Sequence, residues 1–100
     1  MTHQRLDPKE RQKAIMDAAI DLANLIGFEK LRRENVARQA GVSASLVSRH
    51  WGTMTKLRRG IMREAIQREE LKIIAQGIVL RDKQALKVSA NLKERALASL

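Results

Sequence analysis

Residues 35–57 read NVARQAGVSASLVSRHWGTMTKL, and this stretch decides the fold of the chain. Its first six residues place one valine and two alanines at the spacing of one helix face. Gly41 follows, where the end of a helix commonly requires the left-handed backbone conformation that glycine adopts at little cost. Ser43 then stands where an N-cap is expected, ahead of another short helix over about residues 44–50. The stretch therefore predicts two short helices joined by a tight turn.

A pair of helices joined in this way is typical of proteins whose second helix enters the major groove of DNA. The turn alone would also fit a helical hairpin inside any all-α domain. Composition favours the DNA interpretation, because Lys and Arg outnumber Asp and Glu by 20 to 11 and give a formal net charge of +9. Charge does not distinguish DNA from RNA, but one Phe, one Trp and no Tyr give no stacking platform for single strands.

Other classes of function find little support in the chain. There is no cysteine for disulfide or thiolate chemistry, no signal peptide and no apolar run long enough to cross a membrane, so we expect a cytoplasmic protein. His3 and His50 lie too far apart in sequence to suggest a zinc site. The serines of the central stretch are interpreted as caps, because no base with an orienting acid is apparent beside them. We expect no enzyme, no metal and no cofactor.

The rest of the chain predicts an all-α fold. Asp7 and Pro8 are expected to open the first helix and Gly27 to end it, with Phe28 anchoring the loop that follows. Thr53 is a good N-cap for a long fourth helix, which Gly77 ends, kinks or only weakens. The five helices expected cover about residues 8–26, 33–40, 44–50, 54–78 and 83–99. Trp51 is expected in the core.

Two parts of the chain follow from this division: a helix-turn-helix head over residues 1–57 and a helical segment over residues 58–100. The apolar residues from Leu71 onward exceed what a small core in the head can cover, so we expect them on a stripe that faces a second copy of the chain. The residues predicted to dimerise are Ile66, Leu71, Ile74, Ile78, Val88, Leu92 and Ala96.

The central residues resemble the N-terminal DNA-binding domain of tetracycline-repressor (TetR) family regulators. The resemblance without gaps extends from about Ile15 to Leu57, somewhat under half of the chain. The matching residues are Ala18-Ala19, Leu22, Gly27-Phe28, Val36-Ala37, Ala40-Gly41-Val42-Ser43, Val47, Trp51 and Leu57. Many helix-turn-helix proteins share the Ala-Gly-Val-Ser turn, whereas few share the Gly-Phe before it and the His-Trp after it.

The resemblance implies which residues contact DNA. Arg49 is the best candidate for base readout, because a guanidinium can bond a guanine at two positions, although it can equally hold a phosphate. Ser48 replaces the family's usual Tyr, and Met54 replaces its Lys at the start of the fourth helix. Leu31 and Arg32 replace the two usual hydroxyl residues, which alters the cap of the second helix. The implied DNA-binding residues are Arg32, Arg33, Ser43, Ala44, Ser45, Leu46, Ser48, Arg49, His50, Thr53 and Lys56.

The resulting hypothesis is a homodimeric transcriptional regulator, most simply a repressor, that binds an inverted repeat in double-stranded DNA. Only 43 residues follow Leu57, too few to enclose the drug-sized pocket of the family's ligand-binding domain. Either the chain is a fragment, or it is a compact regulator in which one or two helices do the dimerising. The Met1 start and the charged, helical C-terminus favour a complete small protein, for which we expect no small-molecule induction. Two alternatives stay open: a non-specific architectural DNA-binding protein, and an adaptor whose C-terminal helices bind a partner helix.

Overall fold

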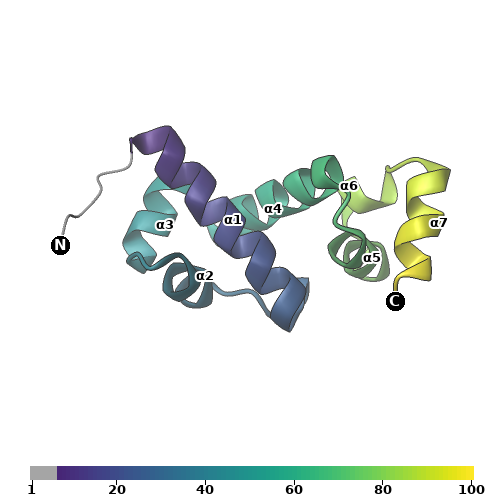
Figure 1. Cartoon of the computed structure of the whole chain (residues 1–100), viewed down its shortest axis with the longest axis horizontal. Coiled ribbons are helices and arrows are strands. Elements are labelled where there is room, and N and C mark those ends of the chain that lie inside the picture. The colour runs from purple at the N-terminus through teal and green to yellow at the C-terminus, as the bar shows by residue number, and fades with distance from the viewer. Residues whose placement is uncertain (1–6) are drawn as a thin grey trace.

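A computed structural model describes residues 7–100, which fold into seven α-helices and one 3₁₀ turn, with no strand among these residues (Figure 1). The elements are α1 (Pro8–Ile26), η1 (Phe28–Lys30), α2 (Arg33–Ala40), α3 (Ala44–Trp51), α4 (Met54–Arg68), α5 (Leu71–Val79), α6 (Lys83–Leu86) and α7 (Ala90–Ala98). The all-α prediction is confirmed. Figure 1 shows α1, α2 and α3 gathered at one end, α5, α6 and α7 at the other, and α4 between the two groups.

The predicted caps of the head are confirmed. The Asp7 carboxylate accepts a hydrogen bond from the Glu10 amide at 2.8 Å at the start of α1. Gly27 ends that helix with a φ of 100°. The Thr53 hydroxyl accepts from the Lys56 amide at 3.2 Å and opens α4. Each cap satisfies a backbone group that the helix itself leaves free, which is why local sequence was enough to find these boundaries.

The prediction of a fourth helix that runs to about residue 78 is wrong, because α4 ends at Arg68. Glu69 adopts a left-handed conformation with a φ of 54°, and the Glu70 amide donates back to the Ala65 carbonyl at 2.8 Å. No glycine or proline marks this end. The turn directs α5 against α4, η1 and α1, where Ile73 joins the main core. A continuous helix would have carried these apolar residues away from that core.

The predicted fifth helix is also divided. Asp82 accepts from the amides of Gln84 and Ala85 at 2.9 and 3.0 Å, as an N-cap should, but the helix it opens, α6, lasts four residues. Ser89 then caps a separate helix, α7, by accepting from the Leu92 amide at 3.2 Å. The break allows Ala85 to pack in the main core while α7 folds over α5.

Two apolar clusters hold the helices together. The main cluster draws residues from α1 through α6, so the predicted boundary at residue 57 falls within α4 and within one continuous core. The second cluster lies between α5 and α7 and has Ile74, Ala75, Leu92 and Ala96 at its centre. It also contains Ile66, Leu71, Ile78 and Val88.

All seven residues predicted to dimerise therefore pack within one chain. The expectation that this stripe lacks a partner in its own chain is wrong, because α5 and α7 cover each other. Ile74 and Ala96 have no exposed surface at all.

An ion pair joins the two long helices. The Arg68 guanidinium at the end of α4 donates to Asp17 on α1 at 2.6 Å and to Glu64 at 2.9 Å. Burial raises the pKa of Asp17, but hydrogen bonds from Arg68 and Lys13 outweigh it and hold that pKa below its ordinary value.

Within residues 7–100, no helix combines the length and apolar character needed to cross a bilayer.

Gly77 neither ends nor interrupts a helix but lies buried inside α5. A Cβ at this position would lie 2.8 Å from the Ala85 Cβ and would collide with the end of the Met62 side chain. The missing side chain thus lets α5 approach both α4 and α6 closely.

Gly77→Ala is expected to destabilise the fold by about 1–3 kcal/mol through overpacking. This sign is opposite to the usual one, since Gly to Ala inside a helix ordinarily stabilises by about 0.5–1 kcal/mol. Urea unfolding of both proteins measures the difference. Combining it with Met62→Ala is expected to recover part of the loss in a double-mutant cycle. An alanine variant as stable as the parent would contradict the close approach.

Candidate nucleic-acid interface

The predicted turn between α2 and α3 is present. Gly41 is left-handed, with φ 71° and ψ 32°, and the Val42 amide donates to the Ala37 carbonyl at 3.0 Å. The Ser43 hydroxyl accepts from the Leu46 amide at 3.1 Å and caps α3. This turn sets the direction in which α3 leaves α2.

One face of α3 belongs to the core and the other is free. Val47 is buried, with 1% of its surface exposed, and Ala44 and Trp51 pack against the main cluster from the same helix. Ser45 and Arg49 are exposed. This helix of eight residues is held by its buried face and leaves the remainder exposed, which is the arrangement expected of a recognition helix.

The predicted DNA-binding residues lie in three places: the start of α2, the whole of α3, and the start of α4. Those exposed to solvent are Arg32, Ser43, Ser45, Arg49, Thr53 and Lys56. Those half-buried are Arg33, Ala44, Leu46, Ser48 and His50. No residue of the set is fully buried, so all retain some surface for a ligand.

Some of these polar groups already have partners within the chain. The Ser48 hydroxyl donates to the Ala44 carbonyl at 3.3 Å, a bond along the helix itself. The Ser43 and Ser45 hydroxyls lie 3.1 Å apart. Arg49 is the exposed cation of α3, and no ion pair or hydrogen bond joins its side chain to the part of the chain described. Because these serines have partners within the chain, Arg49 is the better candidate for base readout.

The altered cap of α2 is confirmed. Arg32 occupies the N-cap position, and its side chain makes no capping hydrogen bond. The helix start therefore presents backbone N–H groups and the positive end of its dipole without a side-chain acceptor.

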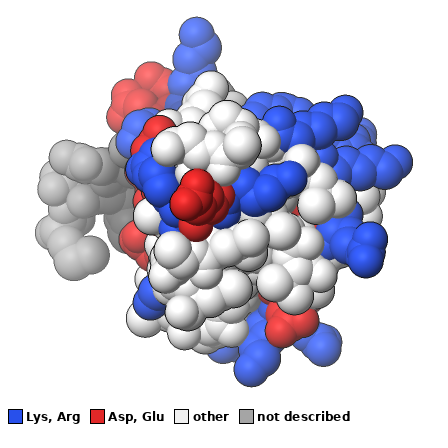
Figure 2. Space-filling model, turned by 90° about the vertical axis from the view of Figure 1, so that its right-hand side faces the viewer, with Lys and Arg blue, Asp and Glu red and all other residues white. Residues whose placement is uncertain are grey.

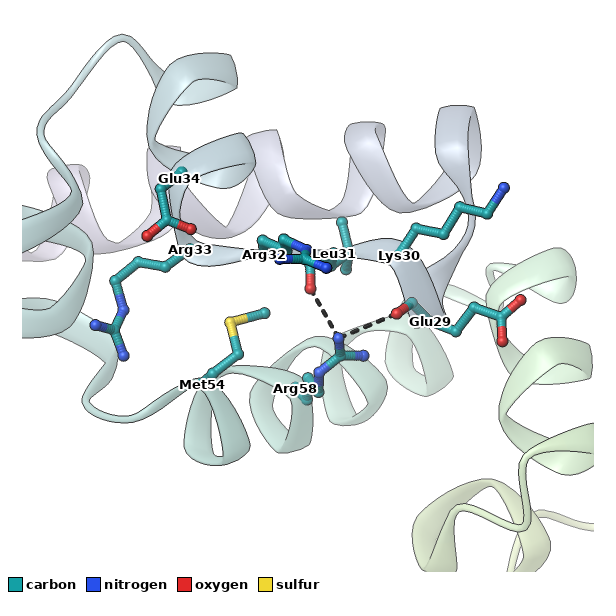
Figure 3. Close-up of a pocket in the computed structure, with 8 residues that line it drawn as sticks. All are labelled: Glu29, Lys30, Leu31, Arg32, Arg33, Glu34, Met54 and Arg58. Atoms are coloured by element: carbon teal, nitrogen blue, oxygen red, sulfur yellow. Dashed lines mark hydrogen bonds between the residues drawn. The ribbon is translucent and has the colours of Figure 1, made fainter.

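A cleft of about 710 Å³ opens beside this helix start (Figure 3). Its cations are Lys30, Arg32, Arg33 and Arg58. Figure 3 shows Met54 between Arg33 and Arg58, where the family's usual lysine would add one more charge. The sequence did not predict Lys30 or Arg58 here, because both join the cleft through the fold of the loop before α2.

Contacts from α1 and α4 fix the end of α3. The Trp51 indole N–H donates to the Gln12 carbonyl at 3.2 Å, and the Gln12 side-chain amide donates to the His50 carbonyl at 3.2 Å. The indole ring lies against Gly60 of α4, where a Cβ would approach ring atom Cζ3 to 2.9 Å. Trp51 is thus half-buried and packed on the core, as predicted, and it also carries a hydrogen bond that the sequence did not show.

Gly60→Ala is expected to push the indole away and to tilt α3. We expect a loss of stability of about 1–3 kcal/mol and weaker DNA binding, because the helix end loses its fixed position. The smaller ring of Trp51→Phe should relieve the clash, so the double variant should be less impaired than the sum of the single ones. Additive losses in denaturant unfolding would contradict the contact.

The geometry of these elements agrees with the comparisons. Residues 15–61 match the family model described as bacterial regulatory proteins of the tetR family. The chain carries a TetR-family N-terminal helix-turn-helix domain. This domain is a DNA-binding module of transcription regulators and not an enzyme. No curated protein and no solved structure matches the chain significantly.

The TetR-family domain comprises most of α1, all of η1, α2 and α3, and the first half of α4. It therefore includes every predicted DNA-binding residue and the Trp51–Gly60 contact. Gln12 lies just outside it, on the first turns of α1.

Among residues 7–100, no three His, Cys, Asp or Glu side chains come together as a metal site would require, and His3 lies outside the described residues.

Proposed function

We propose that the chain is a sequence-specific transcription regulator that acts as a dimer, in the simplest case a repressor that occupies an inverted-repeat operator. The observation that carries the proposal is the capped, outward-facing α3 of a TetR-family domain, with Arg49 free on its surface. A guanidinium in this position suits guanine, to which it can donate two parallel hydrogen bonds in the major groove.

Phosphate contacts would flank this base contact on both sides. The uncapped start of α2 with Arg32 and Arg33 supplies one, and the start of α4 with Lys56 supplies the other. Thr53 and Ser43 cap their own helices and also leave hydroxyl oxygens at the surface. Such contacts hold the register of a protein on the duplex without carrying sequence information.

The dimer interface is proposed on the end of the molecule formed by α5, α6 and α7. Figure 2 views this end and shows areas of uncharged surface that are crossed and bordered by Lys, Arg, Asp and Glu side chains. Val79, Leu80 and Leu100 are 65%, 46% and 71% exposed and line one shallow apolar hollow. Leu97 on α7 is 42% exposed. An apolar centre with a polar margin is the usual anatomy of a protein interface.

This proposed interface lies on the same part of the chain as the apolar stripe that the sequence predicted to dimerise. It uses exposed side chains, because the stripe itself is packed between α5 and α7. The buried cluster between α5 and α7 makes the end rigid, and the leucines and valine outside it supply the surface. Two heads joined in this way would present their α3 helices about 34 Å apart, or near a multiple of that spacing, on one side of the duplex.

We also propose that DNA binding by this chain does not depend on a small inducer. The cleft of about 710 Å³ at α2 is lined mainly by charged side chains and is proposed here as part of the DNA interface. Drug-sized ligands favour concave sites that are mostly apolar. Occupancy of the operator would then follow the concentration of the protein and its dimerisation.

A net charge of +9 supports a second candidate, a non-specific DNA-organising protein. Selection from a pool of random duplexes separates the two. The proposal expects enrichment of an inverted repeat, whereas the alternative expects no motif. An adaptor that binds a partner helix would retain no DNA. Absence of any enriched motif over repeated rounds would reject sequence-specific regulation.

A further inference from the structure

The loop between α1 and α2 has backbone groups that are bound by side chains from distant parts of the chain. Arg58 on α4 donates from Nη1 to the Phe28 carbonyl at 2.9 Å. Its Nη2 donates to the carbonyls of Glu29 and Leu31 at 3.2 and 2.7 Å. The latter two bonds are drawn in Figure 3. One guanidinium thus binds three carbonyls of η1 and the residue that follows it.

Phe28 is held on both of its backbone groups. The Gln76 side chain on α5 accepts from the Phe28 amide at 2.6 Å. The Arg58 guanidinium also lies 5.5 Å from the centre of the Phe28 ring, within range of a cation–π interaction. Phe28 itself is buried, with 4% of its surface exposed. Side chains from α4 and α5 therefore fix η1 from both ends.

The position of η1 determines where α2 starts, because only Leu31 and Arg32 separate the two elements. Leu31 is buried, with 1% of its surface exposed, and it accepts the shortest of the three Arg58 bonds. Arg32, the next residue, is the N-cap of α2 and has no capping bond of its own. The position of this helix start relative to α4 thus depends on Arg58.

Arg58 differs from Lys30, Arg32 and Arg33 in that its guanidinium hydrogen-bonds to backbone carbonyls of the protein. A surface arginine at this edge of the domain would ordinarily be counted as a phosphate contact. The Arg58 side chain is half-buried, and both of its terminal nitrogens donate hydrogen bonds to backbone carbonyls instead. Its neighbour Arg59 is exposed and carries the same charge, which makes it a matched control.

We propose that Arg58, together with Gln76, is a positioning residue for DNA binding: it sets the start of α2 and transmits the placement of α5 to the DNA-binding head. The proposal rests on the proposed function. Arg58 acts through backbone carbonyls and does not touch DNA. Because Gln76 belongs to α5, a change at the C-terminal end of the molecule would reach the DNA interface through η1.

The first test compares Arg58→Lys with Arg59→Lys in the full chain on the selected operator. Lysine keeps the charge but lacks the planar fork that reaches three carbonyls. Arg58→Lys is expected to weaken operator binding about tenfold, the scale of losing one or two charge-assisted hydrogen bonds. Arg59→Lys should leave it within about twofold. Equal affinities of the two variants would overturn the positioning role.

The second test uses salt. Removing one cation that binds a phosphate makes the slope of log K against log salt concentration shallower by about 0.9. Arg58→Met and Arg59→Met remove the same charge, so the proposal expects the same slope for both and weaker binding only for the former. A slope shallower by about one in Arg58→Met alone would make Arg58 a phosphate-binding residue and reject the proposal.

A third test adds a measurement that needs no DNA, and it covers the case in which the Arg58 variants do not fold. Gln76→Met removes the acceptor for the Phe28 amide without changing any charge. Hydrogen exchange at that amide should become faster, and operator binding should weaken with an unchanged salt slope. Unchanged exchange and unchanged affinity would overturn the proposal. If the parent chain selects no DNA motif, the proposed function fails, while exchange at Phe28 still tests the clamp.

Discussion

Arg49→Ala is expected to lower affinity for one half-site of the selected operator by about 10- to 100-fold, the scale of one bidentate hydrogen-bonded contact to guanine. It should also relax sequence preference at one position in each half-site. The reason is geometric: Arg49 is exposed on α3, and the opposite face of that helix is fixed by Val47 and Trp51. Quantitative binding to operators substituted base by base measures both effects.

Arg63→Ala provides the control for charge, since Arg63 is exposed on α4 outside the TetR-family domain. It should reduce binding to all duplexes slightly and equally. If Arg49→Ala behaves in the same way, Arg49 holds a phosphate and another residue of α3 reads the bases. If Arg49→Ala changes nothing, α3 is not the recognition helix.

Replacing both Val79 and Leu80 by Glu is expected to yield a monomer and to weaken binding to the full inverted repeat by about 10²- to 10⁴-fold. That is the advantage that linking two binding modules commonly provides. Both side chains are largely exposed, so the fold should tolerate the change. Two carboxylates facing two more across a twofold axis would repel each other. Sedimentation and operator titration test the two effects together.

Leu25→Glu is the matched control, because Leu25 is 74% exposed but belongs to α1 in the head. It should leave both the oligomeric state and the affinity near those of the parent. A monomeric Leu25 variant, with a dimeric Val79 and Leu80 variant, would move the interface to the head. A parent chain that is monomeric at the concentrations where it binds DNA would reject the dimer altogether.

The helix boundaries of the head could be predicted from the sequence because the residues that set them lie close to them in the chain. Asp7, Ser43 and Thr53 each cap a helix within three residues of themselves, and Gly41 ends α2 in the conformation expected of it. Short-range rules of this kind identify helix ends without knowledge of the fold. The family resemblance also used Gly41 and Ser43, and the matched residues 15–61 include Thr53 as well.

The C-terminal half was less predictable because long-range packing decides it. Glu69 turns the chain without a glycine, since burying Ile73 and Ile74 outweighs the cost of a left-handed residue. Gly77 looked like a helix breaker, although its role is the close approach of α5 to its neighbours. The apolar stripe looked free because the break that lets α7 cover α5 was not visible in the sequence.

Positioning contacts were missed for the same reason. Arg58 and Gln76 meet η1 and the residue after it across 27 to 48 residues of sequence, and Gln12 meets Trp51 across 39. No spacing rule connects residues so far apart. Composition counted Arg58 among the charges available to DNA, and only the fold shows that its donors point inward.

The most direct test of the account is the ratio of affinities for the selected operator and for a scrambled duplex of the same composition, measured at one fixed salt concentration near physiological. A sequence-specific regulator should bind the operator at least about 10³-fold more tightly. The ratio should fall towards one in Arg49→Ala, while binding to the scrambled duplex should change little. A ratio near one for the unaltered chain, with binding to both duplexes falling equally as salt rises, would show that charge alone drives the interaction and would contradict the account.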